Sequence, residues 1–240
     1  MLRFSSARSS NNAYPGSDRI LAIRIFADRR DAGRALALAV QRCELDRPVV
    51  LALPRGGVPV AWEIARALGA PLDIIVVRKL GAPMQPELAI GAIAFGGVRV
   101  LNDELIDTWL SLDKETIDRI SDKESVELDR RERLYRGDRP FPELRNRDVL
   151  LVDDGMATGA TMRAAAAAVR TFGPSKIVVA VPVAAEDAVR QLADLVDDVV
   201  CLETPSPFVA IGYFYSDFGQ TSDAEVRELL TRAEADDASR

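Results

Sequence analysis

Two adjacent carboxylates, Asp153 and Asp154, stand between the apolar run Val149–Val152 and a loop of small and hydroxylated residues, Gly155–Thr161. An alanine-rich segment typical of a helix follows the loop. Exposed backbone N–H groups, two hydroxyls and a helix dipole together favour binding of a phosphate group. Carboxylates repel phosphate but accept hydrogen bonds from the vicinal hydroxyls of a sugar. The segment therefore predicts a site for a 5-phosphorylated ribose held at both ends.

The alternative interpretation is an ordinary strand, turn and helix with a capping threonine and two solvated acids. Paired acids followed by Gly-Met-Ala-Thr-Gly-Ala-Thr argue against it. A classical nucleotide P-loop is excluded because no Gly-Lys-Ser/Thr occurs, and the dinucleotide-binding Gly-x-Gly-x-x-Gly is also missing from the sequence.

Two other apolar runs end in residues that suit an anion. The run 49–53 ends in Pro-Arg-Gly-Gly over 54–57, where glycines let the backbone approach an anion closely and the arginine adds positive charge. Arg78 and Lys79 follow the run Leu72–Val77 in the same way. A plain turn and an exposed basic pair are the alternative interpretations of these two segments.

Alternating strands and helices must position these segments. Short unbroken apolar runs are typical of strands buried on both faces, and helices of 10–13 residues separate them. Such a pattern predicts an α/β fold with a parallel sheet covered on both faces, whose ligands bind beyond the carboxyl ends of the strands. Strands are expected at 49–53, 72–77, 149–152, 176–183 and 199–202, helices at 28–43, 58–68, 161–172, 186–195 and from 222, and a hairpin over 89–101.

The stretch 102–136 differs in being highly charged and helical. Glu127 and Arg131 stand four residues apart with the acid first, which is the stabilising order on a helix. We expect a solvated surface helix. The alternative is that Arg130, Arg131 or Arg133 reaches over a phosphate site.

Composition limits the possible functions. With 48% hydrophobic and 28% charged residues, the chain can form one folded domain, expected over 20–240. A net charge of −6 argues against nucleic-acid binding, and no apolar run reaches the ~20 residues of a membrane span. The complete absence of histidine excludes catalytic triads, His-ligated metals and imidazole acid–base chemistry.

The N-terminal segment and the two cysteines indicate where in the cell the protein is located. Residues 1–19 are rich in Ser and Asn and predict a disordered tail rather than a transit peptide. Cys43 and Cys201 lie far apart in apolar surroundings, which predicts buried thiols. We expect a cytoplasmic protein.

The segment Val149–Thr161 resembles the phosphoribosyl diphosphate (PRPP) binding motif of type I phosphoribosyltransferases. That motif has apolar residues, two acids, two variable residues and a small-residue loop ending in Ser or Thr. Gly155 departs from it, which we expect to loosen the loop without removing a binding group. In that family the loop after the first strand binds diphosphate through backbone amides, often with a non-proline cis peptide, and 53–57 occupies its place. The similarity covers roughly residues 45–205.

The resemblance implies the fold and the site. The fold would be the type I phosphoribosyltransferase fold, with a helical insertion over 102–147 and a small hood over 205–240. A flexible loop over Leu80–Leu88 would close over the site. Catalytic roles are implied for Asp153, Asp154 and Lys79. Substrate binding is implied for Arg55, Gly56, Gly57, Arg78, Lys79, Asp153, Asp154, Gly155, Met156, Ala157, Thr158, Gly159, Ala160 and Thr161.

The implied reaction is transfer of the 5-phosphoribosyl group of PRPP to a nitrogen acceptor, a nucleobase, with release of diphosphate. Mg²⁺ would be held through PRPP, with Asp153 as the one candidate protein ligand, in a homodimer. Finer features, including Phe26–Arg30 and Ser216-Asp217-Phe218, resemble bacterial members of the family with no assigned acceptor. The alternative function is a PRPP- or nucleotide-sensing protein with the same fold.

One residue of the chain limits which nucleobase the resemblance allows as the acceptor. Family members that act on 6-oxopurines carry an acid where this chain has Ala157, which disfavours hypoxanthine or guanine and leaves adenine- and orotate-type acceptors open. Four aromatic residues could stack on a base or serve core or dimer packing: Phe208, Tyr213, Phe214 and Tyr215. A phosphorylated receiver domain has the same sheet class, but its acidic pair should come near the start of the chain.

Overall fold

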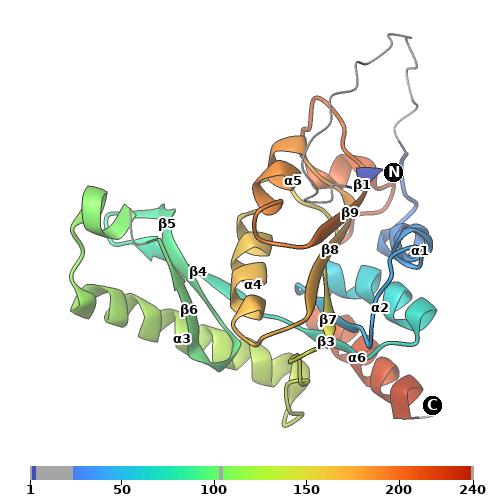
Figure 1. Cartoon of the computed structure of the whole chain (residues 1–240), viewed down its shortest axis with the longest axis horizontal. Coiled ribbons are helices and arrows are strands. Elements are labelled where there is room, and N and C mark those ends of the chain that lie inside the picture. Colours follow the sequence, from blue (N-terminus) through green and yellow to red (C-terminus); the bar gives the residue numbers. More distant parts are fainter. Residues whose placement is uncertain (1, 4–23, 103–104, 239–240) are drawn as a thin grey trace.

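The protein, seen here in a computed structural model that describes residues 2–3, 24–102 and 105–238, has a helix-covered sheet from which a separate arm projects (Figure 1). Five strands of the core sheet are parallel, which confirms the predicted fold class, and β1 pairs antiparallel with β9 at its edge. In spatial order the strands are β1 (Leu2–Arg3), β9 (Asp198–Glu203), β8 (Lys176–Val183), β7 (Asp148–Val152), β2 (Val49–Ala52) and β3 (Leu72–Ile74).

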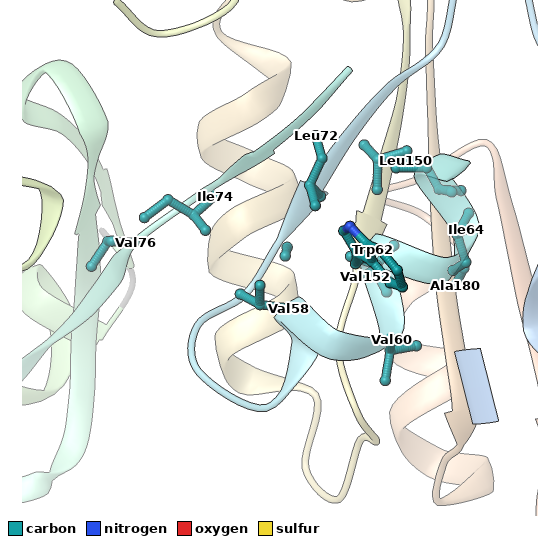
Figure 2. Packing of buried hydrophobic residues seen from close by; sticks show 14 of the residues in the cluster. Val58, Val60, Trp62, Ile64, Leu72, Ile74, Val76, Leu150, Val152 and Ala180 are labelled. Carbon is teal, nitrogen blue, oxygen red and sulfur yellow. The ribbon is translucent and has the colours of Figure 1, made fainter. Parts of the chain in front are cut away.

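Helices cover both faces of this sheet. Alternate strand residues point to opposite faces, so Val50 and Val152 pack beneath helices α1 and α2, whereas Val49 and Leu151 pack beneath α4. Figure 2 shows the first of these clusters, in which Trp62 of α2 lies beside the sheet residues. The core helices are α1 (Arg29–Val40), α2 (Gly57–Leu68), α4 (Ala160–Arg170), α5 (Glu186–Leu192) and α6 (Asp223–Ala238).

Local interactions set the ends of the first two core helices. Asp28 caps α1 by accepting a hydrogen bond from the Asp31 N–H at 2.7 Å. Gly69 ends α2 in the left-handed conformation, with φ of 63°. Cys43 and Cys201 are buried, as predicted.

The arm replaces two predicted features. The strand expected over 72–77 ends at Ile74, and Val77 begins a strand of a second sheet. The flexible loop expected over Leu80–Leu88 is instead largely an antiparallel hairpin. The prolines of this segment favour a loop in the sequence-based prediction, because proline is uncommon within strands. The arm comprises β4 (Val77–Ala82), β5 (Gln85–Ala94), η1 (Phe95–Gly97), β6 (Val98–Leu101), the π-helix η2 (Leu105–Leu110) and α3 (Lys114–Arg136).

The arm therefore extends beyond the helical insertion predicted over 102–147. Its α3 packs against β4 and β5, and α4 lies between the three-stranded sheet and the core (Figure 1). Arg130 and Arg131 both bind Glu127, at 2.7 Å each, which confirms the solvated surface helix. Arg133 is exposed on the same helix.

The predicted hood over 205–240 divides into two parts. Helix α6 packs against α2 and α3 as part of the body. Residues 214–219, here named the C-terminal strap, run beside the start of α1: the Phe26 N–H donates to the Phe214 carbonyl at 2.8 Å, and the Ser216 N–H donates to the Phe26 carbonyl at 2.8 Å. The short helix η3 (Ile211–Phe214) leads into the strap.

The predicted disordered tail, 1–19, falls mostly outside the described residues. Leu2 and Arg3 are an exception, because their backbones pair with β9. None of the helices in the described ranges combines the length and apolar character that crossing a membrane requires.

Candidate active site

Asp153 and Asp154 lie at the carboxyl end of β7, a central strand whose five residues are all buried. The Asp153 Oδ1 atom accepts a hydrogen bond from the Asp154 N–H at 2.8 Å. The Asp154 side chain is 12% exposed, and its Oδ2 atom accepts a hydrogen bond from Arg29 Nε at 2.7 Å. The two carboxylates and Arg29 are here named the acid-pair site.

Burial sets the electrostatics of the acid-pair site. Burial raises the pKa of Asp153, and the neighbouring Asp154 raises it further. Burial also raises the pKa of Asp154, while the Arg29 guanidinium opposes that rise. Two carboxylates that are difficult to ionise together favour a ligand that supplies hydroxyl donors and positive charge.

The Pro-Arg-Gly-Gly loop contacts the acid pair. The peptide bond between Pro54 and Arg55 is cis, as the family resemblance led us to expect. A Cβ atom on Gly56 would overlap the Asp154 Oδ2 atom, and one on Gly57 would lie 2.9 Å from the Asp153 Cα atom. Glycine is therefore required at both positions by close approach, and the two predicted loops form one site.

The loop predicted to bind phosphate, Gly155–Thr161, is here named the phosphate loop, and backbone hydrogen bonds to the sheet hold part of it. The Met156 N–H donates to the Val183 carbonyl at 2.9 Å and the Met156 carbonyl accepts from the Ala185 N–H at 2.9 Å. Met156 therefore extends the β7–β8 pairing, and its N–H is engaged by the sheet. A Cβ on Gly155 would lie 2.5 Å from Ile211 Cγ2, so this glycine permits packing against η3 rather than loosening the loop.

The rest of the phosphate loop leads into the start of α4. Ala157 and Thr158 are exposed, and Gly159 takes a left-handed conformation, φ 69°, immediately before α4. Ala160 and Thr161 form the first turn of α4, where backbone N–H groups lack helix partners. An anion at this helix end would meet these donors and the positive end of the helix dipole.

The three predicted basic residues lie in different surroundings. Arg55 pairs with Asp223 of α6 at 3.6 Å, and Arg78 donates to Glu124 of α3 through two nitrogens at 2.8 and 2.6 Å. Lys79 lines a cavity of about 640 Å³ between the arm and α4.

That cavity brings Lys79 and the end of the phosphate loop to the same site. Its wall includes Ala160, at the end of the phosphate loop, and Arg163 one turn further along α4. Lys79 therefore shares a cavity with the phosphate loop, whereas the ion pair of Arg78 with Glu124 holds that side chain to the arm.

Two residues contact Asp154 in ways that the sequence did not predict: Arg29 was not among the predicted site residues, and Tyr215 was expected only to stack on a base or to pack. Arg29 reaches Asp154 from the start of α1, and the Tyr215 hydroxyl donates to the Asp154 backbone carbonyl at 2.5 Å. The signal for Arg29 in the sequence was confined to Phe26–Arg30, one of the segments that resemble bacterial family members.

The aromatic residues expected to stack on a base are mainly packing residues. Phe214 and Tyr215 are buried, and Phe208 stacks on Phe214 with ring centroids 5.7 Å apart. Tyr215 also stacks on Phe218 at 4.9 Å. Tyr213 is 70% exposed. The packing alternative therefore holds for Phe214 and Tyr215.

The acid pair suits a magnesium ion that is shared with a substrate. In the described part of the chain, no group of three acidic, cysteine or histidine side chains could hold a metal alone. Mg²⁺ commonly binds through one or two carboxylates together with substrate phosphates. Asp153 and Asp154 meet that requirement.

Comparison with known proteins adds three findings. The sequence profile of the phosphoribosyl transferase domain family matches residues 18–217. The provisionally named phosphoribosyl transferases Rv0571c and MT0597 of Mycobacterium tuberculosis are each 49% identical over 214 residues, which cover 89% of this chain and 48% of theirs. This chain thus spans about half the length of these relatives. TT1426 of Thermus thermophilus has a crystal structure that matches with a TM-score of 0.80 and 45% identity, covering 87% of this chain and 98% of that one.

Proposed function

The chain belongs to the phosphoribosyl transferase domain family, and from that premise we propose that it transfers the 5-phosphoribosyl group of PRPP to a nitrogen acceptor. Diphosphate leaves the anomeric carbon of the ribose as the acceptor nitrogen bonds to it. The observation that carries the proposal is the convergence of the Pro-Arg-Gly-Gly loop on Asp153 and Asp154, so close that a side chain on Gly56 would overlap a carboxylate oxygen.

The site residues have separate roles in this reaction. The Asp153 and Asp154 carboxylates accept hydrogen bonds from the ribose hydroxyls and stabilise the positive charge that develops on the sugar ring. The first turn of α4, with Thr158 and Thr161, holds the 5-phosphate. Lys79 and the 54–57 loop stabilise the departing diphosphate. Catalysis then comes from positioning and electrostatic stabilisation, without a covalent intermediate on the protein.

Mg²⁺ would be held by Asp153 together with the hydroxyl and diphosphate oxygens of PRPP, and would supply positive charge to the leaving group. The acceptor is proposed to be a nucleobase other than a 6-oxopurine, because Ala157 stands where 6-oxopurine enzymes carry an acid.

A second candidate function is PRPP or nucleotide sensing without turnover. It is favoured by the ion pairs of Arg55 with Asp223 and Arg78 with Glu124, because both arginines are expected at the diphosphate. It is also favoured by the paired strands β4 and β5 where a flexible closing loop was expected. A sensor needs the ribose and phosphate contacts but not a closing loop.

Titration calorimetry with PRPP, with and without Mg²⁺, tests the proposal. Ribose 5-phosphate is the control ligand, and thermal unfolding is followed in parallel. We expect binding of PRPP that Mg²⁺ strengthens. At about 100 times the dissociation constant, PRPP should raise the free energy of unfolding by roughly 2.7 kcal/mol.

Diphosphate release then separates the two candidates. Release in the presence of a nitrogenous acceptor supports the transferase. PRPP binding with no release across nucleobase acceptors supports the sensor. Binding of neither PRPP nor ribose 5-phosphate contradicts both.

A further inference from the structure

We propose that Arg29 is a positioning residue of the acid-pair site, fixing the Asp154 carboxylate so that one of its oxygens faces the ligand. The inference rests on the proposed function, because the ligand it concerns is the ribose of PRPP. Arg29 acts through Asp154 and is not assigned a contact with substrate.

Three contacts fix the Arg29 guanidinium. Its Nε donates to Asp154 Oδ2 at 2.7 Å, and its Nη1 donates to the Gly219 carbonyl at 2.6 Å. Its Cζ atom lies 4.0 Å from the centre of the Phe218 ring. The side chain is only 12% exposed although it begins at the first residue of α1. A guanidinium held on two edges and one face has little freedom to turn.

The acid pair is held at one oxygen of each carboxylate. Asp154 is fixed through Oδ2 by Arg29 and through its backbone carbonyl by Tyr215. Asp153 is fixed through Oδ1 by the Asp154 N–H. Within the described residues, no hydrogen bond engages Asp154 Oδ1 or Asp153 Oδ2. Each carboxylate therefore keeps one oxygen available as an acceptor, and two such oxygens suit two vicinal hydroxyls.

Without Arg29, this arrangement would lose its counter-charge. Adjacent carboxylates repel one another, and low exposure strengthens the repulsion. The Asp154 side chain can reduce it by rotating away from Asp153. Arg29 prevents that rotation, and the C-terminal strap, through Gly219 and Phe218, holds Arg29.

The matched control is Arg34, on the same helix. Arg34 is 56% exposed and pairs with Asp31 at 3.6 Å and Glu63 at 3.7 Å. Both of these partners lie outside the acid-pair site. Arg34→Met therefore removes a guanidinium from α1 without altering the proposed role.

The experiment compares the affinities of PRPP and inorganic diphosphate for six proteins. These are the wild type, Arg29→Met, Arg29→Lys, Asp154→Asn, the double variant Arg29→Met with Asp154→Asn, and the control Arg34→Met. Inorganic diphosphate carries the charge of the leaving group but has no hydroxyls of a sugar. Near-ultraviolet circular dichroism establishes that each variant is folded.

We expect Arg29→Met to lower PRPP affinity by about tenfold or more, the effect of a charge-assisted hydrogen bond, and diphosphate affinity by less than about twofold. Arg29→Lys should restore part of the PRPP affinity, because its ammonium can still pair with Asp154. The double variant should bind PRPP no more weakly than Asp154→Asn alone. Arg34→Met should bind both ligands as the wild type does.

Two results would overturn this inference without contradicting the proposed function. One is an equal loss of PRPP and diphosphate affinity in Arg29→Met, which would assign Arg29 a general electrostatic or structural role. The other is a double variant whose loss is the sum of the single losses. If Arg29→Met does not fold, the test uses Arg29→Lys instead. The ratio of its PRPP affinity to its diphosphate affinity is compared with the same ratio in the wild type. An unchanged ratio overturns the inference. A wild type that binds neither ligand overturns the proposed function as well.

Discussion

The acid-pair site and the arm both gather charged side chains, but they balance the charges differently. On the arm, acids and bases pair with each other: Arg78 with Glu124 at 2.6 Å and Arg99 with Asp118 at 2.5 Å. At the acid-pair site, one arginine contacts only one of the two low-exposure carboxylates, Asp154. The arm's charges hold its own elements together, whereas the acid pair keeps one carboxylate, Asp153, without an arginine contact among the described residues, and a ligand can supply the missing donors.

This difference separates two uses of charge in one molecule. Pairs at the surface are screened by water and contribute little to stability, about 0–1 kcal/mol each. Buried, incompletely paired carboxylates lower stability, and such groups cluster at functional sites. The comparison thus predicts that substitutions in the acid-pair site change ligand binding more than substitutions of the paired charges in the arm do.

The largest effect is expected from Asp153→Asn combined with Asp154→Asn. Loss of two charged acceptors should lower PRPP affinity by about 100-fold or more. The fold should be retained, because the amides fill the same volume and remove the repulsion between the carboxylates. Calorimetry measures the affinity, and denaturant unfolding measures the stability.

The arm counterpart of this variant is Asp118→Asn, which breaks the pair with Arg99. It should leave PRPP affinity unchanged. If the double acid variant binds PRPP as tightly as the wild type, the site assignment is wrong. If Asp118→Asn weakens binding equally, the contrast between the two regions fails.

Glycine substitutions give the next largest effect. A methyl group on Gly56 would overlap Asp154 Oδ2, so Gly56→Ala should lower PRPP affinity by about tenfold or more. It should also lower the free energy of unfolding by about 1–3 kcal/mol. In the arm, a methyl on Gly91 would overlap the Val100 carbonyl oxygen. Gly91→Ala should therefore cost similar stability with a smaller loss of affinity, and equal losses of affinity would contradict this prediction.

Substitutions of Arg78 and Lys79, the two neighbouring cations of β4, should lower diphosphate affinity by different amounts. Lys79 lines the cavity it shares with the phosphate loop, whereas Arg78 binds Glu124. Lys79→Met should weaken diphosphate binding by about tenfold, and Arg78→Met by less than about threefold. The measurement is calorimetry with inorganic diphosphate. A larger effect from Arg78 would mean that it leaves Glu124 when ligand binds.

The smallest effect on ligand binding is expected from a buried acid where the arm joins the core, because this acid acts on stability alone. Burial raises the pKa of Glu132 to about 7, although Arg136 opposes the rise. The folded protein therefore keeps the proton at pH values where the unfolded chain has lost it. Stability from this group is present below about pH 4.5 and is lost as pH rises to about 7.

Denaturant unfolding between pH 5 and pH 8 tests this dependence. Glu132 should contribute a fall of about 2 kcal/mol in the free energy of unfolding across this range. Glu132→Gln, which cannot ionise, should lack that component while the rest of the pH profile is unchanged. A profile that is identical in both proteins would show that Glu132 titrates normally.

Local patterns were sufficient to predict most of the core. The apolar runs 49–53 and 149–152 are strands because both faces of the sheet are covered, and helix caps such as Asp28 bind groups only a few residues away. The two glycine-containing loops were likewise predicted at the ends of their strands. These features depend on short stretches of sequence.

The arm and Arg29 depend on pairings that local patterns do not encode. The run Leu72–Val77 is largely apolar, yet the chain leaves the core sheet after Ile74 because Val77 pairs with Ala94 of β5. Prolines 83 and 86 suggested a loop, whereas β4 and β5 pair on either side of a tight turn. Arg29 could not be assigned because its partner is 125 residues away.

The C-terminal strap also determines when the site can form during synthesis. The phosphate loop and the acid pair are complete at residue 161, but Tyr215 lies 61 residues after Asp154, and the Gly219 carbonyl that holds Arg29 comes later still. Contacts between distant parts of a chain form late in folding. A nascent chain that ends at α4 therefore carries the phosphate loop and the acid pair without the strap that holds Arg29. The protein cannot complete the acid-pair site, as it is held in the folded chain, until residue 219 has left the ribosome.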